Sequence, residues 1–240
     1  MKLLTTTALT LGFFAMAGCA QAQADAVSLT DKSQIEAIVK SYLLENPELI
    51  RDVLIELEAK QGRETLAAVS DALHKDPRDV SIGPKDAKVT IVEFFDYNCG
   101  FCKKSTQWLK DTMEEHPNDV RVIFKELPIL DGRSKTSRNA AKAALAASRQ
   151  GKYSTMHFAL MAERSLTPER VRKMAAKAGL DMDKFDKDMN DAEIERQIDD
   201  TILLSDRIPA LTGTPFFVIG DEFVSGANIA KLESILDKAL

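Results

Sequence analysis

The sequence predicts an α/β domain that follows a helical N-terminal extension. Two runs of β-branched and aromatic residues, at 88–95 and 119–129, have the composition of strands, and a helical segment separates them. A helical block follows, and a hairpin signal and a last helix close the chain. Between residues 30 and 75 the apolar residues recur at helical spacing instead. Strand, helix, strand, helical block, hairpin and helix in this order indicate the α/β class.

The composition excludes several classes of protein. The chain has 240 residues, of which 45% are hydrophobic and 29% charged, as in ordinary globular proteins. Its 32 Lys and Arg against 37 Asp and Glu give a net charge of −5, which argues against a nucleic-acid partner. Three cysteines are too few for a disulfide-rich scaffold. The three histidines are scattered, so we expect no metal site and no cofactor.

The first 24 residues have the layout of a secretory signal peptide. A short positive start, Met1-Lys2, precedes the apolar run 3–17, and small residues in Ala-x-Ala patterns follow it. The apolar run is shorter than the roughly 20 residues that a membrane-spanning helix needs. We therefore predict an exported, periplasmic protein.

Cys19 provides an alternative way of processing the N-terminus. Ala17-Gly18-Cys19 resembles the end of a bacterial lipoprotein cleavage box, although Met16 stands where that box usually has a branched aliphatic residue. The alternative is a lipoprotein anchored at Cys19. In both cases the mature chain lies outside the cytoplasm, where disulfides persist.

Residues 27–78 are predicted to form a helical N-terminal segment. One apolar stripe runs from Ile35 to Leu43, Asn46-Pro47 interrupts it, and a second stripe begins at Leu49. A two-helix hairpin cannot bury so much apolar surface by itself, so it must cover its own domain or another subunit. We predict a homo-oligomer that associates through residues 30–75. A helical pair packed on its own domain fits the spacing equally well.

Residues 79–240 are predicted to form the main domain. Asp76-Pro77 and Gly83-Pro84 mark the linker before it. The expected elements carry local start and stop signals: a helix over 134–150 that ends at Gly151, a helix capped by Thr167 with Pro168 in its first turn, a helix around 194–202, strands at 216–219 and 222–225 joined by Gly220-Asp221, and a last helix capped by Asn228.

The chemistry of the chain is expected at Cys99-Gly100-Phe101-Cys102, between a strand and a helix. Two cysteines three apart at a helix start lie on one face, close enough for a Cys99–Cys102 redox disulfide. The unpaired amides and positive dipole of the helix start favour the thiolate of Cys99. In such motifs the thiol pKa falls to about 3.5–7 from about 8.5. We therefore predict that Cys99 attacks disulfides and that Cys102, one turn further and shielded, resolves them.

Two other interpretations of the cysteine pair are weaker. A zinc site needs a second ligand pair at suitable spacing, and the sequence has neither a further Cys pair nor two suitably spaced histidines. An inert structural disulfide usually closes a longer loop.

Thr214-Pro215 is a second candidate site, at the start of a predicted strand. Proline cannot donate to a sheet, so its place there marks a special backbone position. If the Thr214–Pro215 bond is cis, the turn exposes backbone polar groups to a docked peptide. A trans proline that merely starts the strand is the alternative that base rates favour.

The segment 89–102 (VTIVEFFDYNCGFC) resembles the active-site segment of DsbA-type thioredoxin-fold proteins, and 213–217 (GTPFF) resembles their cis-proline loop. The block at about 130–207 is similar to the helical insertion of that family. The resemblance implies a thioredoxin-like fold with a helical insertion, a substrate groove lined by Thr214 and Pro215 beside Gly100 and Phe101, and Glu93 as the buried acid that assists proton transfer at the resolving thiol. An exposed strand carboxylate is the alternative for Glu93.

Two features modify what this resemblance implies. DsbA oxidases commonly carry Pro-His between the cysteines, whereas Gly100-Phe101 is similar to the Gly-Tyr of DsbC-type isomerases and lacks a cation to stabilise the thiolate. Residues 35–61 are similar to the N-terminal segment of suppressor-of-copper-sensitivity (ScsC) proteins, some of which oligomerise and isomerise disulfides.

We therefore expect an exported thiol–disulfide oxidoreductase that acts on cysteine-containing client proteins, leans towards isomerase or reductase, and uses a membrane redox partner. A monomeric DsbA-like dithiol oxidase is one alternative. A non-catalytic chaperone or copper-binding module is the alternative of another class.

Overall fold

The computed structural model describes residues 31–240. The predicted signal peptide, its cleavage sites and Cys19 lie outside the described residues. The chain separates into two compact units, with the division between Arg51 and Asp52.

The N-terminal segment is helical, as the periodicity predicts. Helix α1 (Lys32–Glu45) begins after Asp31, whose carboxylate accepts a hydrogen bond from the backbone of Ser33 at 2.9 Å. The helix ends at Glu45, and its C-cap Asn46 precedes the proline that starts α2 (Pro47–Ala68). A short helix α3 (Ser70–His74) follows.

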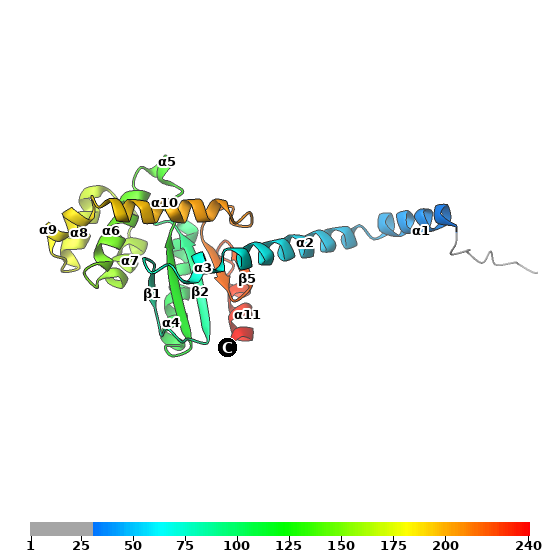
Figure 1. Ribbon diagram of the computed structural model, residues 1–240, viewed down its shortest axis with the longest axis horizontal. Helices are drawn as coiled ribbons and strands as arrows, with labels where there is room; N and C mark the ends of the chain where they lie inside the picture. Colours follow the sequence, from blue (N-terminus) through cyan, green and yellow to red (C-terminus); the bar gives the residue numbers. More distant parts are fainter. Residues whose placement is uncertain (1–30) are drawn as a thin grey trace, which may run out of the picture. The chain divides into compact units, whose positions relative to one another are not determined.

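The domain is built on a five-stranded sheet with strand order β1-β3-β2-β4-β5 (Figure 1). Strands β2 and β3 are parallel, and all other neighbours are antiparallel. The strands are β1 (Val80–Ile82), β2 (Val89–Phe95), β3 (Val120–Glu126), β4 (Phe216–Ile219) and β5 (Glu222–Ser225). This arrangement, with the helices around it, is the expected α/β thioredoxin-like fold.

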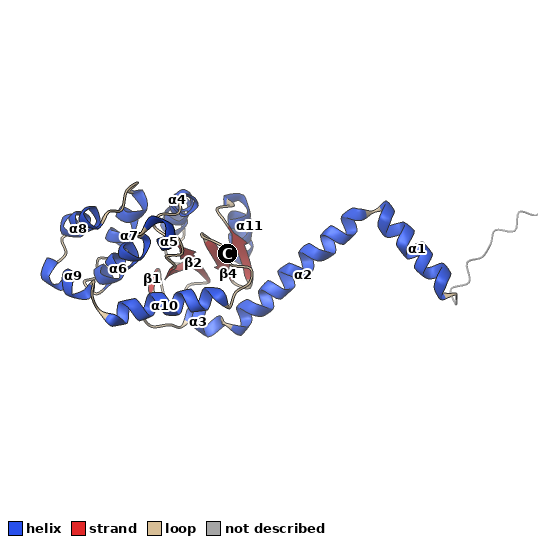
Figure 2. Cartoon of the chain, turned by 90° about the horizontal axis from the view of Figure 1, so that it is seen from above, coloured by secondary structure: helices blue, strands red, loops and turns tan. Residues whose placement is uncertain are grey.

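Eight helices of the domain follow β2, and Figure 2 shows them in blue around the red strands. Six of them, α5 to α10, form the helical insertion between β3 and β4. The eight helices are α4 (Gly100–Glu115), α5 (Asp131–Ser134), α6 (Ser137–Ser148), α7 (Tyr153–Ala162), α8 (Pro168–Lys177), α9 (Met182–Asp188), α10 (Ala192–Asp206) and α11 (Ile229–Ala239).

Successive side chains of β2 and β3 enter two different cores. Phe95 and Phe124 pack in the larger cluster, with α6, α7 and α11. Phe94 and Ile123 pack in the second cluster, which also contains Leu66, Val69 and Leu73 of the N-terminal segment. The alternation follows from the two-residue period of a strand. The last turn of α2 and helix α3 are therefore part of the domain core.

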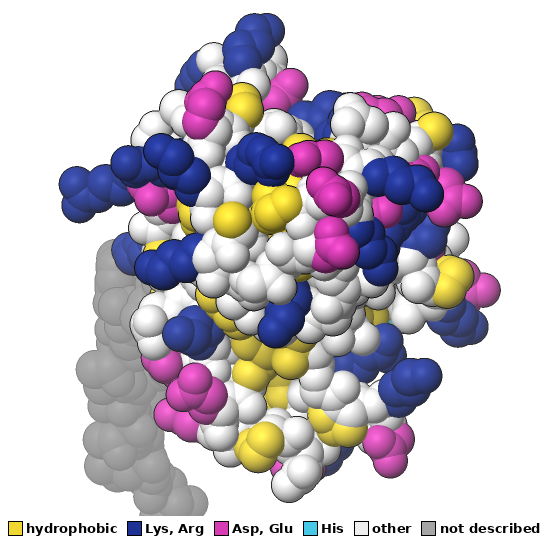
Figure 3. Space-filling view, turned by 90° about the vertical axis from the view of Figure 1, so that its left-hand side faces the viewer, with side chains coloured by type: hydrophobic (Ala, Val, Ile, Leu, Met, Phe, Trp, Pro, Cys, Tyr) yellow, Lys and Arg dark blue, Asp and Glu magenta, His cyan; other side chains and the backbone are white. Residues whose placement is uncertain are grey.

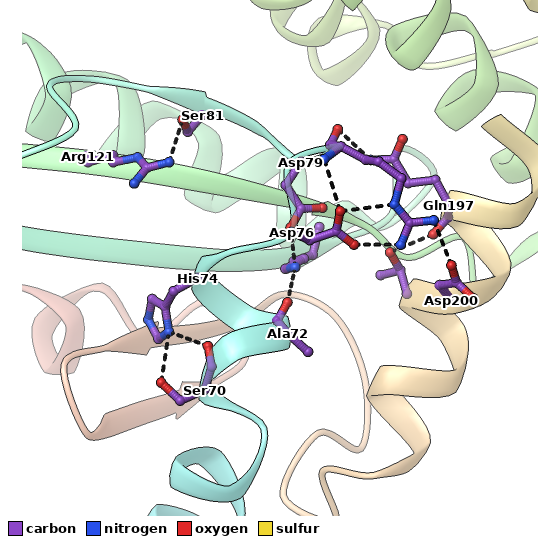
Figure 4. Close-up of polar contacts among 12 residues, drawn as sticks. Ser70, Ala72, His74, Asp76, Asp79, Ser81, Arg121, Gln197 and Asp200 are labelled. Atoms are coloured by element: carbon purple, nitrogen blue, oxygen red, sulfur yellow. Dashed lines mark hydrogen bonds and ion pairs between the residues drawn. The ribbon is translucent and has the colours of Figure 1, made fainter. Parts of the chain in front are cut away.

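Polar contacts fix the chain between α3 and β1 to the domain (Figure 4). Lys125 of β3, nearly fully buried, donates to the carbonyl of Ala72 at 2.5 Å and is paired with Asp79. Arg78 bridges Asp76 and Asp200 of α10, with N···O distances of 2.6 and 2.7 Å. These contacts attach the same segment to β3 and to the insertion.

The surface of the helical insertion carries charges of both signs. Figure 3 shows Lys and Arg side chains interspersed with Asp and Glu on the face that it presents. Some of the charged side chains of the insertion are paired, such as Arg149 with Asp188 at 3.0 Å and Arg172 with Asp186 at 2.8 Å.

The structure differs from the expectation at two predicted elements and in one additional strand. The strand predicted to reach 129 ends at Glu126, shortly before Pro128, which cannot donate to a ladder. The helix predicted over 134–150 is divided, because Lys135 has a left-handed backbone with φ of 60° between α5 and α6. Strand β1 was not predicted.

Candidate active site

Cys99 occupies the N-cap position of α4. Strand β2 ends at Phe95, and the turn 96–98 leads directly to this cysteine. Its sulfur accepts a hydrogen bond from the backbone amide of Cys102 at 3.3 Å. The sulfur therefore caps one of the amides that a helix start leaves without an intrahelical partner.

Cys99 is an acidic thiol. Hydrogen bonding by the Cys102 side chain is the largest influence and, together with the Thr214 side chain and the backbone amides of Phe101 and Cys102, lowers its pKa to about 6 against the opposing effect of burial. A thiol with this pKa is mostly ionised at neutral pH, and the thiolate is the form that attacks disulfides.

Cys102 has the opposite properties. It lies inside α4 with no exposed surface, and both cysteines are free thiols in the structure. Burial raises the pKa of the Cys102 thiol far above its ordinary value, and its hydrogen bond with Cys99 and the charge of Glu93 act in the same direction. One cysteine of the pair is thus poised to ionise and the other to keep its proton.

Glu93 is buried on β2, as its place in an apolar run indicates. Its Oε1 atom has no hydrogen-bond partner among the described residues. Burial raises the pKa of this carboxyl to about 8, and the neighbouring charge of Cys99 contributes further. A carboxyl with a pKa near neutrality can both take up and release a proton under working conditions.

Gly100 and Phe101 lie at the surface between the two cysteines. An added Cβ at Gly100 would meet no atom within 4 Å. The side chain of Phe101 is 66% exposed, which is unusual for a large aromatic side chain. The site therefore presents an apolar ring to solvent next to its acidic thiol.

Thr214 and Pro215 lie beside Cys99, joined by a cis peptide bond. The cis bond agrees with the resemblance of 213–217 to a cis-proline loop, and the trans bond that base rates favour is not found here. Strand β4 pairs with β2 in the register Phe94–Phe216, which brings the preceding loop to the start of α4. The protonated sulfur of Cys99 donates to the carbonyl oxygen of Thr214 at 3.1 Å. The structure therefore brings the two sequence-predicted motifs into direct contact.

The turn before Cys99 contains polar residues that the sequence analysis did not select. Asp96 accepts hydrogen bonds from the backbone of Asn98 at 2.7 Å, the hydroxyl of Ser137 at 2.8 Å and the backbone of Leu130 at 2.9 Å. These contacts tie the turn to the helical insertion. Asp and Asn before a helix are ordinary turn residues, so the local sequence gave no sign of partners more than 30 residues away.

Tyr97, in the same turn, was also not selected, and neither were its partners Glu126 and His157. Its hydroxyl donates to Glu126 at 3.0 Å and lies 3.0 Å from Nδ1 of His157. Many of the residues near each of the three in the sequence are aromatic or apolar, which indicated only packing.

Within residues 31–240 no group of three or more His, Cys, Asp or Glu side chains is placed to hold a metal ion. None of the helices in this range has both the length and the apolar character needed to cross a membrane.

Two family models match the sequence. One described as DSBA-like thioredoxin domain matches residues 90–237, and one described as Copper resistance protein ScsC N-terminal domain matches residues 31–64. The first covers the helical insertion, Cys99 and Cys102, and the sheet except β1 and the first residue of β2. The second covers α1 and most of α2.

Solved structures of thiol–disulfide proteins have the same fold. A linker-deletion variant of ScsC from Proteus mirabilis has a TM-score of 0.70 and 28% identity over 89% of this chain and 97% of that one. The thiol-disulfide exchange protein alpha-DsbA2 from Wolbachia pipientis has a TM-score of 0.69 and 27% identity over 76% and 97%. A periplasmic thioredoxin-like protein from Salmonella enterica serovar Typhimurium has a TM-score of 0.62 and 31% identity over 72% and 95%.

Curated relatives that match in sequence are named as Na(+)/H(+) antiporters. The NhaA 3 antiporter of Salinispora tropica is 31% identical over 164 residues, which are 68% of this chain. The match spans only 25% of the antiporter, about a quarter of its length. The similarity thus concerns one part of a much longer protein.

Proposed function

The chain belongs to the DSBA-like thioredoxin domain family of thiol–disulfide oxidoreductases, and we propose that within this family it is an exported enzyme that reduces and rearranges the disulfides of client proteins. The observation that carries the proposal is the contrast between the two thiols of one motif. Cys99 has a pKa lowered to about 6, while the pKa of the buried Cys102 is raised.

The first step is attack by the Cys99 thiolate on a client disulfide. A bond forms between the Cys99 sulfur and one client sulfur, the client disulfide breaks, and the second client sulfur leaves as a thiolate that takes up a proton. The product is a mixed disulfide. The amide of Cys102 that already faces the Cys99 sulfur stabilises the attacking anion.

Two outcomes follow from the mixed disulfide. In reduction, Cys102 attacks the Cys99 sulfur, passes its proton to ionised Glu93, and expels the client thiolate, so that the client gains two electrons and the Cys99–Cys102 disulfide forms. In isomerisation, another client thiolate attacks the client sulfur of the mixed disulfide and expels Cys99 unchanged, with no net electron transfer. Reduction needs a redox partner that returns Cys99 and Cys102 to thiols, and we assign that role to a membrane protein.

Thr214, Pro215, Gly100 and Phe101 are proposed to bind the client segment around its reactive cysteine. The carbonyl of Thr214 lies 3.1 Å from the reacting sulfur, and the ring of Phe101 is exposed beside it. A backbone acceptor and an apolar ring recognise a polypeptide by features common to many sequences, which suits an enzyme with varied clients.

The preference for isomerase or reductase over oxidase rests on Gly100-Phe101. No cationic side chain stands between the cysteines, so no positive charge there adds to the stability of the thiolate in the reduced form. Less stabilisation of the reduced form makes a couple less oxidising.

The N-terminal helices support association with further copies of the chain. Helix α1 has no buried residue, and apolar side chains of α1 and of the first half of α2 are exposed. Exposed apolar surface of this extent marks an interaction site. The side chains are Ile35, Ile38, Val39, Tyr42, Leu44, Leu49, Ile50, Val53, Leu54, Ile55 and Leu57.

Export is proposed from the signal-peptide pattern of residues 1–24, with a lipid anchor at Cys19 as the alternative. The Salmonella protein of the same fold is described as periplasmic. The mass of the protein purified from its native compartment distinguishes the cases: a chain that begins near Asp25 or at a lipidated Cys19 supports export, and one that begins at Met1 contradicts it.

The test of the chemistry is insulin reduction together with trapping of clients. The full mature chain should reduce insulin in the presence of dithiothreitol, and Cys99→Ser should not. Cys102→Ala should accumulate mixed disulfides with clients, whereas Cys99→Ala should trap none. The reverse trapping pattern would overturn the assignment of the two cysteines, and an inactive mature chain would favour a chaperone or copper-binding role.

A further inference from the structure

A buried polar cluster lies next to the site and has no part in the proposed chemistry. Tyr97, in the turn after β2, and Tyr153, in α7, donate hydrogen bonds to the same oxygen of Glu126, at 3.0 and 2.9 Å. His157 of α7 lies with Nδ1 3.0 Å from the Tyr97 hydroxyl, and its ring stacks on Tyr153. All four side chains are buried. We call them the Glu126 cluster.

The protons of the Glu126 cluster can be assigned by counting donors. A tyrosine hydroxyl has one hydrogen, and that of Tyr97 points to Glu126. Nδ1 of His157 must therefore carry a hydrogen and donate to Tyr97. Its Nε2 has no partner among the described residues, and burial lowers the pKa of this imidazole to about 3. His157 is thus neutral, and the Tyr97 hydroxyl donates to Glu126 and accepts from His157.

Tyr97 stands in the turn that delivers Cys99. The amide of Cys99 donates to the carbonyl of Asp96 at 3.0 Å, so the turn is closed across Tyr97. Asp96 and Asn98 bind the region around α5 and α6. Tyr97 binds different elements, Glu126 of β3 and His157 of α7. The position of the cysteine sulfur therefore depends on three consecutive anchored side chains.

Packing alone does not account for the Glu126 cluster. Phenylalanine at position 97 would fill nearly the same space without a polar atom. A buried carboxyl costs free energy even when it is hydrogen-bonded, and apolar replacements of buried charged groups are often neutral or stabilising. Within residues 31–240, moreover, Oε2 of Glu126 and Nε2 of His157 have no hydrogen-bond partner. Such costly groups gather at functional sites more than elsewhere.

We infer that Tyr97 is a positioning residue for the reaction of Cys99: its hydroxyl, fixed by Glu126 and His157, holds the turn that places the Cys99 sulfur on the amide of Cys102 and beside the carbonyl of Thr214. The inference rests on the proposed function only in that Cys99 is the attacking thiol. It makes α7 of the helical insertion a contributor to the acidity of a thiol that it does not touch.

Several other ionisable groups act on the Cys99 thiol or on Tyr97 and must be held constant in a test. They are Glu93 on β2, Asp96 in the turn, Cys102 and Lys103 in α4, Glu126 on β3, and Tyr153 and His157 in α7.

The test compares Tyr97→Phe with Tyr153→Phe in the full mature chain. Each removes one hydroxyl from the same oxygen of Glu126, so their losses of thermal stability should be similar. Only Tyr97→Phe frees the turn, so the pH midpoint of Cys99 alkylation should rise by about half a unit or more, a roughly threefold loss of thiolate below the midpoint. Tyr153→Phe should leave that midpoint within about 0.2 unit of the parent. Alkylation read by mass spectrometry needs no client turnover.

A second pair of variants separates the effect of the position of Tyr97 from the effect of a charge on Glu126. Glu126→Gln keeps an oxygen that accepts the Tyr97 hydroxyl and should keep the midpoint, whereas Glu126→Leu should raise it as Tyr97→Phe does. Glu126→Leu also replaces Tyr97→Phe if that variant does not fold. Equal midpoints in Tyr97→Phe and Tyr153→Phe, or an equal shift in Glu126→Gln and Glu126→Leu, would overturn the inference. A parent chain whose Cys99 does not titrate below the ordinary thiol range would overturn the proposed function instead.

Discussion

At Cys99 hydrogen bonding lowers the pKa and burial raises it, and a single substitution can remove part of the hydrogen bonding. The hydrogen bond with the Cys102 side chain is the largest of the influences that lower the pKa to about 6. In Cys102→Ala the side chain is gone but the backbone amide at 102 remains. The pKa of Cys99 should therefore rise towards its ordinary value without reaching it. Alkylation rate against pH measures the midpoint, and an unchanged midpoint would show that the helix start alone acidifies this thiol.

Glu93 should reduce the stability of the protein as the pH rises. In the unfolded chain its pKa is near 4.5, and in the folded chain burial raises it to about 8. Between these values the unfolded state has lost a proton that the folded state still holds, so the free energy of unfolding falls with increasing pH.

Glu93→Gln removes this titration. Its free energy of unfolding minus that of the parent should be constant below pH 4.5, should rise by at most about 1.4 kcal/mol per pH unit above it, and should level off near pH 8. Urea unfolding at a series of pH values measures the difference. A constant penalty of the buried amide shifts every value equally and leaves the dependence on pH unchanged. A difference that does not vary with pH would contradict the raised pKa.

Among single residues, the sequence predicted the roles of those that a local sequence pattern identifies. The spacing of Cys99 and Cys102 is itself the signal, and Glu93 in an apolar run had to be buried. The Glu126 cluster could not be predicted this way, because Glu126 and His157 lie 29 and 60 residues after Tyr97. No local pattern indicates contacts over such separations.

Strand β3 is the element that joins both cores of the domain. Lys125 and Glu126 are consecutive, so their side chains point to opposite faces of the sheet. Lys125 holds Ala72 and Asp79 on one face, and Glu126 holds Tyr97 and Tyr153 on the other.

Lys125→Met should destabilise the protein by about 3–5 kcal/mol, because it leaves the buried carboxyl of Asp79 without its partner. Asp79→Asn added to Lys125→Met should recover part of the loss, since it removes the unpaired charge. Guanidinium unfolding of the two variants measures both effects. If Lys125→Met unfolds like the parent, the ion pair does not hold the segment after α3 to the sheet.

Elements with their own start and stop signals were predicted, and those defined by distant partners were not. Thr167 and Asn228 cap α8 and α11 as expected, and Gly220-Asp221 joins β4 to β5. Strand β1 has only three residues and exists because it pairs with β3 about 40 residues later. Nothing within Val80–Ile82 distinguishes it from a loop.

For the whole molecule, the exposed side chains of α2 provide a test of association that leaves the domain intact. Deletion of the entire predicted helical segment would remove Leu66, Val69 and Leu73 from the domain core. Charged substitutions at Ile50, Val53 and Leu57 avoid this, because these three side chains are exposed.

The triple variant Ile50→Glu, Val53→Glu, Leu57→Glu should be monomeric by light scattering, while the parent chain is an oligomer. It should lose most of its refolding activity on scrambled ribonuclease and still reduce insulin, because several linked sites hold one client better than one. Lys60→Glu, an exposed change on the same helix, should alter neither property. A parent chain that is already monomeric would favour the dithiol oxidase alternative.

The interaction between the Cys99 sulfur and the Thr214 carbonyl turns from attraction to repulsion when the thiol ionises. The protonated sulfur donates to the Thr214 carbonyl at 3.1 Å, but a thiolate has no hydrogen to give and would face a partial negative charge. The carbonyl then needs another donor, and a backbone N–H of an incoming chain would supply one. The proton loss that makes the Cys99 sulfur a nucleophile thus also frees the Thr214 carbonyl to accept a hydrogen bond from an incoming chain. Activation of the thiol and exposure of the docking acceptor therefore occur together.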